Sequence, residues 1–147
     1  MEIKQVVVTG QNQAELQTAE IHDENLGPNE ILVETEYTYI STGTELANYT
    51  GREPRVFQSG SWCAYPWRSG YANVGIVRAT GNGVTRVKSG ERVFTYGNHA
   101  SMIRYNVGRL VAPVPSNIDP AIAAASRMAG VAATAVIVSE VGNNPWV

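Results

Sequence analysis

The sequence predicts a mainly β domain with helices at its C-terminal end. Through most of the first 115 residues, β-branched and aromatic residues cluster between Gly, Pro and Asn, as is typical of short strands separated by turns. Several strands at this spacing predict a barrel or a sandwich. Near residue 118 the composition changes, and an alanine-rich stretch follows a helix-start signal. At 147 residues, the chain is long enough for one substantial core.

The clearest strand is predicted at residues 33–39, where acidic residues alternate with apolar or aromatic ones. We expect this strand to be half buried. A second alternation predicts a strand with two distinct faces, Ile103, Tyr105 and Val107 on one and Met102, Arg104 and Asn106 on the other. Between the two strands, Gly81-Asn82-Gly83 is expected to supply the positive φ angles of a tight turn.

A short helix is predicted after residue 42, because Thr42-Gly43-Thr44-Glu45 fits a capping box. Thr42 would be its N-cap, Glu45 would reach back, and Gly51 would end the helix. The following residues, 51–70, contain two tryptophans and no periodicity. Their aromatic side chains either line a cleft or pack this loop onto the strands.

A longer helix is predicted to begin at Asp119-Pro120, an N-cap followed by proline at the first helical position. It continues through residues 121–138, which are rich in small apolar side chains. We expect a buried helix here rather than a membrane span, because a bilayer would penalise the charge of Arg127.

Composition and charge exclude several classes of protein. A formal net charge of -2 and the absence of any Lys/Arg run make nucleic acid and anionic membranes unexpected partners. The single cysteine, Cys63, excludes an intramolecular disulfide and a cysteine-rich zinc finger. The N-terminus lacks the pattern of a signal peptide, so a cytoplasmic location is expected. His22 and His99 belong to no recognisable catalytic or metal motif, and a surface or hydrogen-bonded role is expected for each.

Five segments carry a more specific signal through their order along the chain. They are Gly27-Pro28-Asn29-Glu30-Ile31-Leu32-Val33, Gly75-Ile76-Val77, Gly81-Asn82-Gly83-Val84, Val87-Lys88-Ser89-Gly90-Glu91-Arg92-Val93 and Val114-Pro115-Ser116-Asn117-Ile118. Together they resemble the N-terminal, GroES-like domain of medium-chain dehydrogenases/reductases, the zinc alcohol dehydrogenase superfamily. The resemblance implies a GroES-like β-barrel over residues 1–118 and a helical segment over residues 119–147 that leads to a Rossmann domain.

The resemblance also implies an oxidoreductase that transfers hydride between NAD or NADP and an alcohol or carbonyl substrate. No G-x-G-x-x-G motif occurs in the 147 residues, so we expect them to bind no cofactor themselves. We expect a piece of a longer enzyme, inactive alone, whose partners are a small-molecule substrate, its own Rossmann domain and further copies in a homo-oligomer. A naturally free-standing domain is the alternative.

A competing class is a non-enzymatic binding or assembly module akin to the co-chaperonin GroES. The barrel of that protein shares the Gly/Val pattern. Residues 94–147 argue against this class, because a co-chaperonin has no use for a proline segment and alanine-rich helices that lead towards a Rossmann domain.

The positions that hold zinc in the resembled family are changed in this sequence. Thr42 stands at the cysteine of C-x-[ST]-D, Tyr71 at the histidine of G-H-E, and Met128 near the third ligand. A hydroxyl, a phenol and a thioether make a poor zinc site, so no zinc is expected. Thr44 matches the hydroxyl that relays the substrate proton, and Glu45 matches the acid that supports a metal ligand.

The candidate catalytic residues are therefore Thr44, Tyr71, Thr42 and Glu45. The capping box explains Thr42 and Glu45 equally well. Tyr71 either donates a hydrogen bond to a carbonyl oxygen or simply covers the barrel. The run from Ser41 to Glu45 resembles the branch of the family that includes bacteriochlorophyllide dehydrogenases.

Overall fold

The computed structural model describes residues 1–22 and 24–138. Within this part of the chain, strands dominate and the last element is a long helix. The elements are β1 (Glu2–Gly10), β2 (Gln13–Glu20), β3 (Glu30–Thr38), α1 (Thr44–Tyr49), the 3-10 helix η1 (Pro54–Phe57), β4 (Trp67–Arg68), β5 (Asn73–Thr80), β6 (Arg92–Thr95), β7 (Met102–Asn106), β8 (Val111–Pro113) and α2 (Pro120–Val138).

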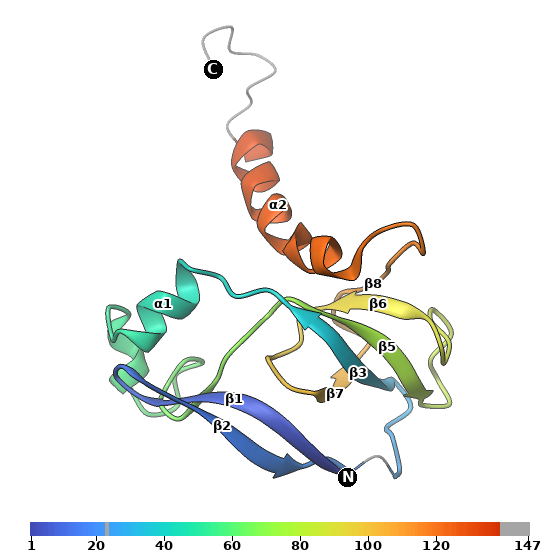
Figure 1. The fold of residues 1–147 in the computed structure, drawn as a ribbon, viewed down its shortest axis with the longest axis horizontal. Helices are drawn as coiled ribbons and strands as arrows, with labels where there is room; N and C mark the ends of the chain where they lie inside the picture. Colours follow the sequence, from blue (N-terminus) through green and yellow to red (C-terminus); the bar gives the residue numbers. More distant parts are fainter. Residues whose placement is uncertain (23, 139–147) are drawn as a thin grey trace, which may run out of the picture.

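The described strands pair in two antiparallel sheets (Figure 1). One has the order β2-β1-β4, and the other has the order β7-β3-β5-β6-β8. A bridge between Gln5 and Ala100 joins them, and the Val6 N–H donates to the His99 carbonyl at 2.8 Å. The predicted class, mainly β with a C-terminal helix, is confirmed. The ladder of the described strands does not close into one barrel.

The main core lies on the five-stranded sheet and depends on apolar residues from β3, β5, β6 and β7. Its buried members are Ile31, Val33, Val77, Val87, Val93, Ile103, Tyr105 and Val111. The predicted alternation in β7 is confirmed, because Ile103 and Tyr105 are buried while Arg104 and Asn106 are exposed. Pairs of β-branched side chains on neighbouring antiparallel strands are the packing unit of such a sheet.

The predicted even alternation in β3 is wrong. Leu32 and Val33, on opposite faces, are both buried, whereas Tyr37 is 49% exposed. The pairing of β3 with β5 shifts register between Leu32 and Val33 and again between Thr35 and Tyr37. Each irregularity changes which face the following side chains occupy, so a strict period of two does not describe the whole strand.

The turn at residues 81–84 forms as predicted, with the Val84 N–H donating to the Gly81 carbonyl at 3.1 Å. The predicted positive φ angles are wrong, because neither Gly81 nor Gly83 adopts one. Glycine is needed at position 81 for close approach: a Cβ there would lie 2.0 Å from the Gly27 carbonyl oxygen. The family-like Gly27 and Gly81 segments thus touch each other.

Gly81→Ala is expected to destabilise the domain by about 1–3 kcal/mol, because two backbone segments must move apart. Gly130→Ala is the control, since a Cβ at that helical position meets nothing within 4 Å. That control should raise stability by about 1 kcal/mol through helix propensity alone. Urea unfolding of both variants measures the difference, and an unchanged midpoint for Gly81→Ala would contradict the close-approach argument.

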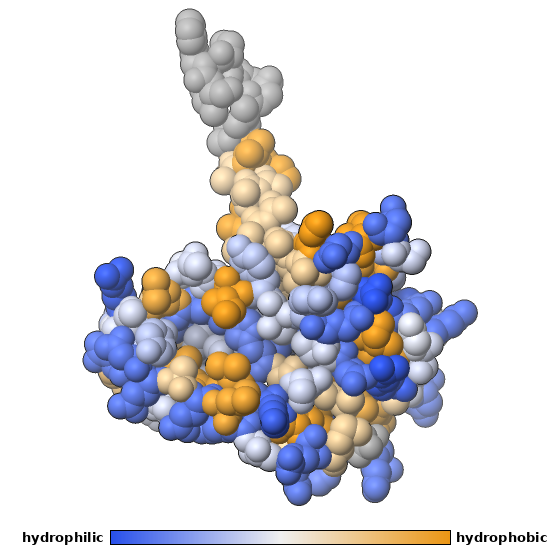
Figure 2. Space-filling view, viewed as in Figure 1, coloured by the Kyte–Doolittle hydropathy of each residue, from blue (hydrophilic) through white to orange (hydrophobic). Residues whose placement is uncertain are grey.

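Helix α2 begins as predicted, because Asp119 Oδ1 accepts the N–H groups of Ala121 and Ile122 at 2.7 and 3.3 Å. The prediction that this helix is buried is wrong. Only Ala123 and Ala124 are buried, against Ala72, Val74 and Phe94. Beyond this contact the helix projects from the sheets, and Figure 2 shows its apolar surface.

The distal part of α2 leaves Val131 48% and Val138 75% exposed. By length and composition alone, α2 could also cross a membrane.

The two tryptophans of the loop at residues 51–70 differ in burial. Trp67 is buried with Val8, Val56 and Cys63, whereas Trp62 is 56% exposed and its ring centroid lies 6.1 Å from that of Trp67.

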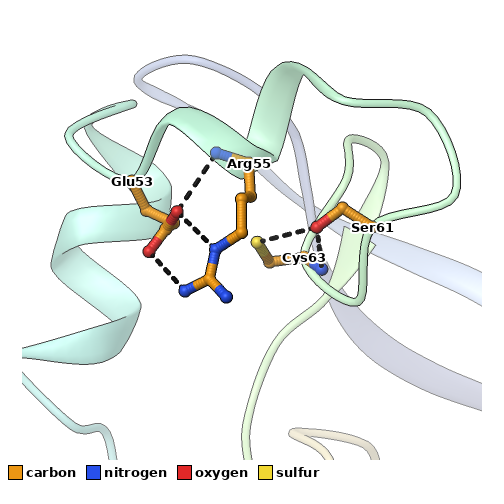
Figure 3. A network of polar contacts seen from close by, with 4 residues as sticks. All are labelled: Glu53, Arg55, Ser61 and Cys63. Atoms are coloured by element: carbon orange, nitrogen blue, oxygen red, sulfur yellow. Dashed lines mark hydrogen bonds and ion pairs between the residues drawn. The ribbon is translucent and has the colours of Figure 1, made fainter.

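The same loop is held locally by Arg55, which donates two side-chain hydrogen bonds of 2.8 Å to Glu53 (Figure 3). These bonds and the Arg55 backbone N–H lower the pKa of Glu53 to about 2. The Glu53 carboxylate therefore remains ionised at physiological pH.

Candidate functional site

A cleft of about 580 Å³ opens where the connection between β3 and α1 faces the first half of α2. Tyr39 and residues 41–44 form one wall, and Arg127, Met128 and Val131 form the other. Trp62 and Tyr71 complete the lining. We call this hollow the α1–α2 cleft.

The structure brings most of the predicted site residues together in this cleft. Thr42, Thr44, Tyr71 and Met128 all line it, although they come from three separate segments of the chain. The side chains of Thr42 and Thr44 make no hydrogen bond within the described residues, and both residues are exposed. Each hydroxyl is therefore available to a small molecule.

The predicted capping box does not form at Thr42. The N-cap of α1 is Gly43, and no side chain caps this end. Glu45 instead reaches one residue further back, where its Oε1 accepts the Ser41 N–H at 2.8 Å. The C-terminal end of α1 is as predicted, because Thr50 is the C-cap and Gly51 follows with a φ of +71°.

Glu45 lies beneath the cleft rather than in its lining. Its side chain is 8% exposed, and Oε2 lies 2.8 Å from the Nε2 atom of His99. Because one Glu45 oxygen holds the Ser41 N–H and the other holds His99, this carboxylate fixes the start of α1 to the segment after β6. From this position, Glu45 supports the wall of the cleft and does not line it.

His99 has the hydrogen-bonded role expected of it, but the sequence does not indicate its partner. Its Nδ1 atom is buried and has no hydrogen-bond partner within the described residues. The side chain of His22 takes part in no such pair, and its backbone carbonyl accepts from Arg104 at 3.2 Å. Only His99 is thus part of the site's support.

A second, mostly apolar cavity of about 420 Å³ lies on the other side of this support. Val6, Val8, Leu46 and Trp67 contribute to its lining, with Glu45 and His99 among the few polar groups. It shares Ser41 and Thr42 with the α1–α2 cleft. In Figure 2 this face is hollowed between α1 and the β1–β2 hairpin. No sequence pattern indicates this cavity.

Arg127 is a site residue that sequence reasoning used only as an argument against a membrane span. Its guanidinium carbon lies 5.6 Å from the ring centroid of Tyr71 and 5.0 Å from that of Tyr96. A cation over an aromatic face is attracted by the ring quadrupole. The contact therefore fixes a positive charge beside the Tyr71 side chain.

The donor atoms of the cleft do not fit zinc, the metal implied by the family resemblance. Thiolate, imidazole and carboxylate are the usual ligands, whereas Thr42, Tyr71 and Met128 offer a hydroxyl, a phenol and a thioether. Within residues 1–22 and 24–138, no three His, Cys, Asp or Glu side chains are placed to share a metal ion. The cleft instead offers hydrogen-bond donors and one cation.

Comparison with known proteins identifies the family to which this chain is similar. A sequence model described as the alcohol dehydrogenase GroES-like domain matches residues 27–143. The 2-desacetyl-2-hydroxyethyl bacteriochlorophyllide A dehydrogenase of Cereibacter sphaeroides is 35% identical over 143 residues, which cover 88% of this chain and 42% of that protein. This relative lies in the branch that residues 41–45 resemble.

Solved structures agree on the fold. The human synaptic vesicle membrane protein VAT-1 homolog-like protein superposes with a TM-score of 0.76 at 24% identity, covering 97% of this chain and 45% of that one. Escherichia coli quinone oxidoreductase complexed with NADPH superposes with a TM-score of 0.67 at 23% identity, covering 96% of this chain and 41% of that one. This chain thus spans less than half the length of these relatives. Because the family model covers most of the sequence, the chain belongs to the alcohol dehydrogenase GroES-like domain family of medium-chain dehydrogenases and reductases.

Proposed function

We propose that these residues form the substrate-side domain of a zinc-independent, NAD(P)-dependent oxidoreductase that acts on an alcohol or a carbonyl compound. The observation that carries the proposal is the α1–α2 cleft. It gathers the hydroxyls of Thr42 and Thr44 with the phenol of Tyr71, and no cysteine, histidine or carboxylate lines it within the described residues. The family's dehydrogenases and reductases support the reaction class.

A nicotinamide cofactor, when bound, would supply or accept the hydride. During reduction, the carbonyl oxygen gains negative charge, which hydrogen-bond donors in a partly closed site can stabilise. Thr44 is the first candidate donor because its hydroxyl is exposed in the cleft and matches the family's relay position. Tyr71 is the second, since its phenol stands in the same lining.

The roles of Thr42 and Glu45 follow from their positions. Thr42 lines the cleft beside Thr44 and offers a further hydroxyl to the substrate. Glu45 positions both threonines through the hydrogen bond that it accepts from the Ser41 N–H. We assign it no contact with the reacting atoms, because it is absent from the cleft lining.

We further propose that a nucleotide-binding domain of the same protein covers the distal part of α2. The exposed apolar residues Val131, Ile137 and Val138 favour a protein surface there, and this chain covers only 41% of the quinone oxidoreductase, whose structure holds NADPH. Such a contact would place the cofactor against the cleft. A cytoplasmic location and a homo-oligomeric whole protein remain predictions of the sequence.

The complete protein is expected to oxidise NADH or NADPH in the presence of a suitable carbonyl compound, and EDTA should not reduce this rate. A panel of aldehydes, ketones and quinones, followed by the absorbance of the reduced nicotinamide, tests this directly. Elemental analysis after dialysis should find less than stoichiometric zinc. One tightly held zinc per chain, or turnover that depends on added zinc, would contradict the proposal and turn attention to His22, His99 and Cys63.

A further inference from the structure

Arg127 brings the only charged side chain to the lining of the α1–α2 cleft, as far as residues 1–22 and 24–138 are concerned. Four of the other eight arginines each pair with a carboxylate: Arg55 with Glu53, Arg78 with Glu34, Arg92 with Glu36 and Arg104 with Glu30. Arg127 has no acid partner within the described residues. Within those residues, its charge therefore has no acid partner at the wall of a hollow large enough for a small molecule.

The guanidinium group of Arg127 is held in place. The turn of α2 that precedes it is anchored by the buried Ala123 and Ala124. The rings of Tyr71 and Tyr96 lie 5.6 and 5.0 Å from the guanidinium carbon. A side chain fixed in this way loses little additional freedom when it binds a ligand.

One donor of this group lacks an acceptor. The Nε atom of Arg127 is buried and has no hydrogen-bond partner within the described residues. A buried, charged donor without a partner is costly, and such groups are normally satisfied in the functional state of a protein. A guanidinium presents parallel N–H groups that match the two oxygens of a carboxylate.

We propose that Arg127 binds a carboxylate of the substrate and so determines which alcohols or carbonyl compounds the cleft accepts. The proposal rests on the proposed function, because it takes the α1–α2 cleft as the substrate site. One guanidinium without a second cation in the described lining fits a single negative charge better than a phosphate dianion. The anchored carboxylate would orient the rest of the substrate towards Thr44 and Tyr71.

Nuclear magnetic resonance of the arginine Nε–Hε groups in the 147-residue chain tests this without any turnover. The Arg127 signal is assigned by its loss in Arg127→Gln. Sodium benzoate is the probe, and benzyl alcohol is the neutral molecule of similar size. We expect benzoate to shift the Arg127 signal saturably, and benzyl alcohol to leave it in place.

Variants of two arginines that lie over tyrosine rings, Arg127 and Arg109, separate binding from the effect of general charge. Arg127→Gln should weaken benzoate binding at least about tenfold, as followed by backbone amide shifts around Tyr71, whereas Arg127→Lys should retain part of it. Arg109→Gln is the matched control, because Arg109 also lies over a tyrosine ring, 5.2 Å from that of Tyr105, but does not line the cleft. Its affinity for benzoate should be unchanged.

Three results would overturn the inference: no saturable shift with benzoate, an equal shift with benzyl alcohol, or saturation by phenyl phosphate but not by benzoate. The last would assign Arg127 to a phosphate group. None of these results measures hydride transfer or zinc, so the proposed function could stand if Arg127 failed this test. Conversely, a zinc-dependent enzyme would refute the proposed function while leaving benzoate binding at Arg127 measurable.

Discussion

On the proposed function, Thr44→Val is expected to lower the kcat of the complete protein about ten- to a thousandfold, the range typical of lost acid–base and oxyanion contacts. Valine keeps the shape of threonine but removes the hydroxyl. Because Thr44 is exposed in the α1–α2 cleft and its hydroxyl makes no hydrogen bond within the described residues, the fold should lose little. Steady-state kinetics together with a urea unfolding curve separate the two effects.

Thr80→Val is the matched control for this experiment. Thr80 is an exposed threonine at the end of β5, outside the cleft lining, so the same chemical change there should leave kcat unaltered. A different result would reassign the proton donor: if Thr44→Val keeps full turnover while Tyr71→Phe abolishes it, the Tyr71 phenol is the leading group.

Thr42→Val should not destabilise α1, because Gly43 rather than Thr42 is the N-cap.

Glu45→Ala is expected to lower the free energy of unfolding by about 3 kcal/mol or more, which is a large fraction of the stability of a small domain. The change leaves His99 Nε2 and the Ser41 N–H without their acceptor in a buried place. Burial makes this loss costly, because the two side chains of the pair are only 7–8% exposed to solvent. Chemical denaturation of the chain, followed by far-UV circular dichroism, measures the loss.

Two variants show whether burial is the cause. Glu45→Gln keeps an acceptor and the side-chain volume, so its loss should be smaller. Glu53→Ala removes the acid of the more exposed pair with Arg55, where solvent competes for the charges, and should have a much smaller effect. If Glu45→Ala unfolds at the wild-type urea concentration, the pair with His99 does not hold the start of α1 in place.

The fold class and several element boundaries could be predicted from the sequence because their causes are local. Asp119 and Pro120 begin α2 through contacts with the next few residues, and the sides of β7 follow from the alternation around Ile103 and Tyr105. The family-like glycine segments also allowed the family to be recognised. Thr42, Thr44 and Tyr71 then followed as cleft residues from their match to family positions.

The support of the site and its charge depended on contacts between distant parts of the chain. Glu45 meets His99 across 54 residues only because the segment after β6 packs beneath α1, and a capping-box pattern cannot distinguish this from a local cap. Arg127 stands beside Tyr71 only because α2 leaves the sheets at Ala123 and Ala124. Periodicity and turn chemistry report interactions over a few residues. The packing of α1 and α2 against the sheets instead set the partner of Glu45, the exposure of α2 and the placement of Arg127 in the cleft.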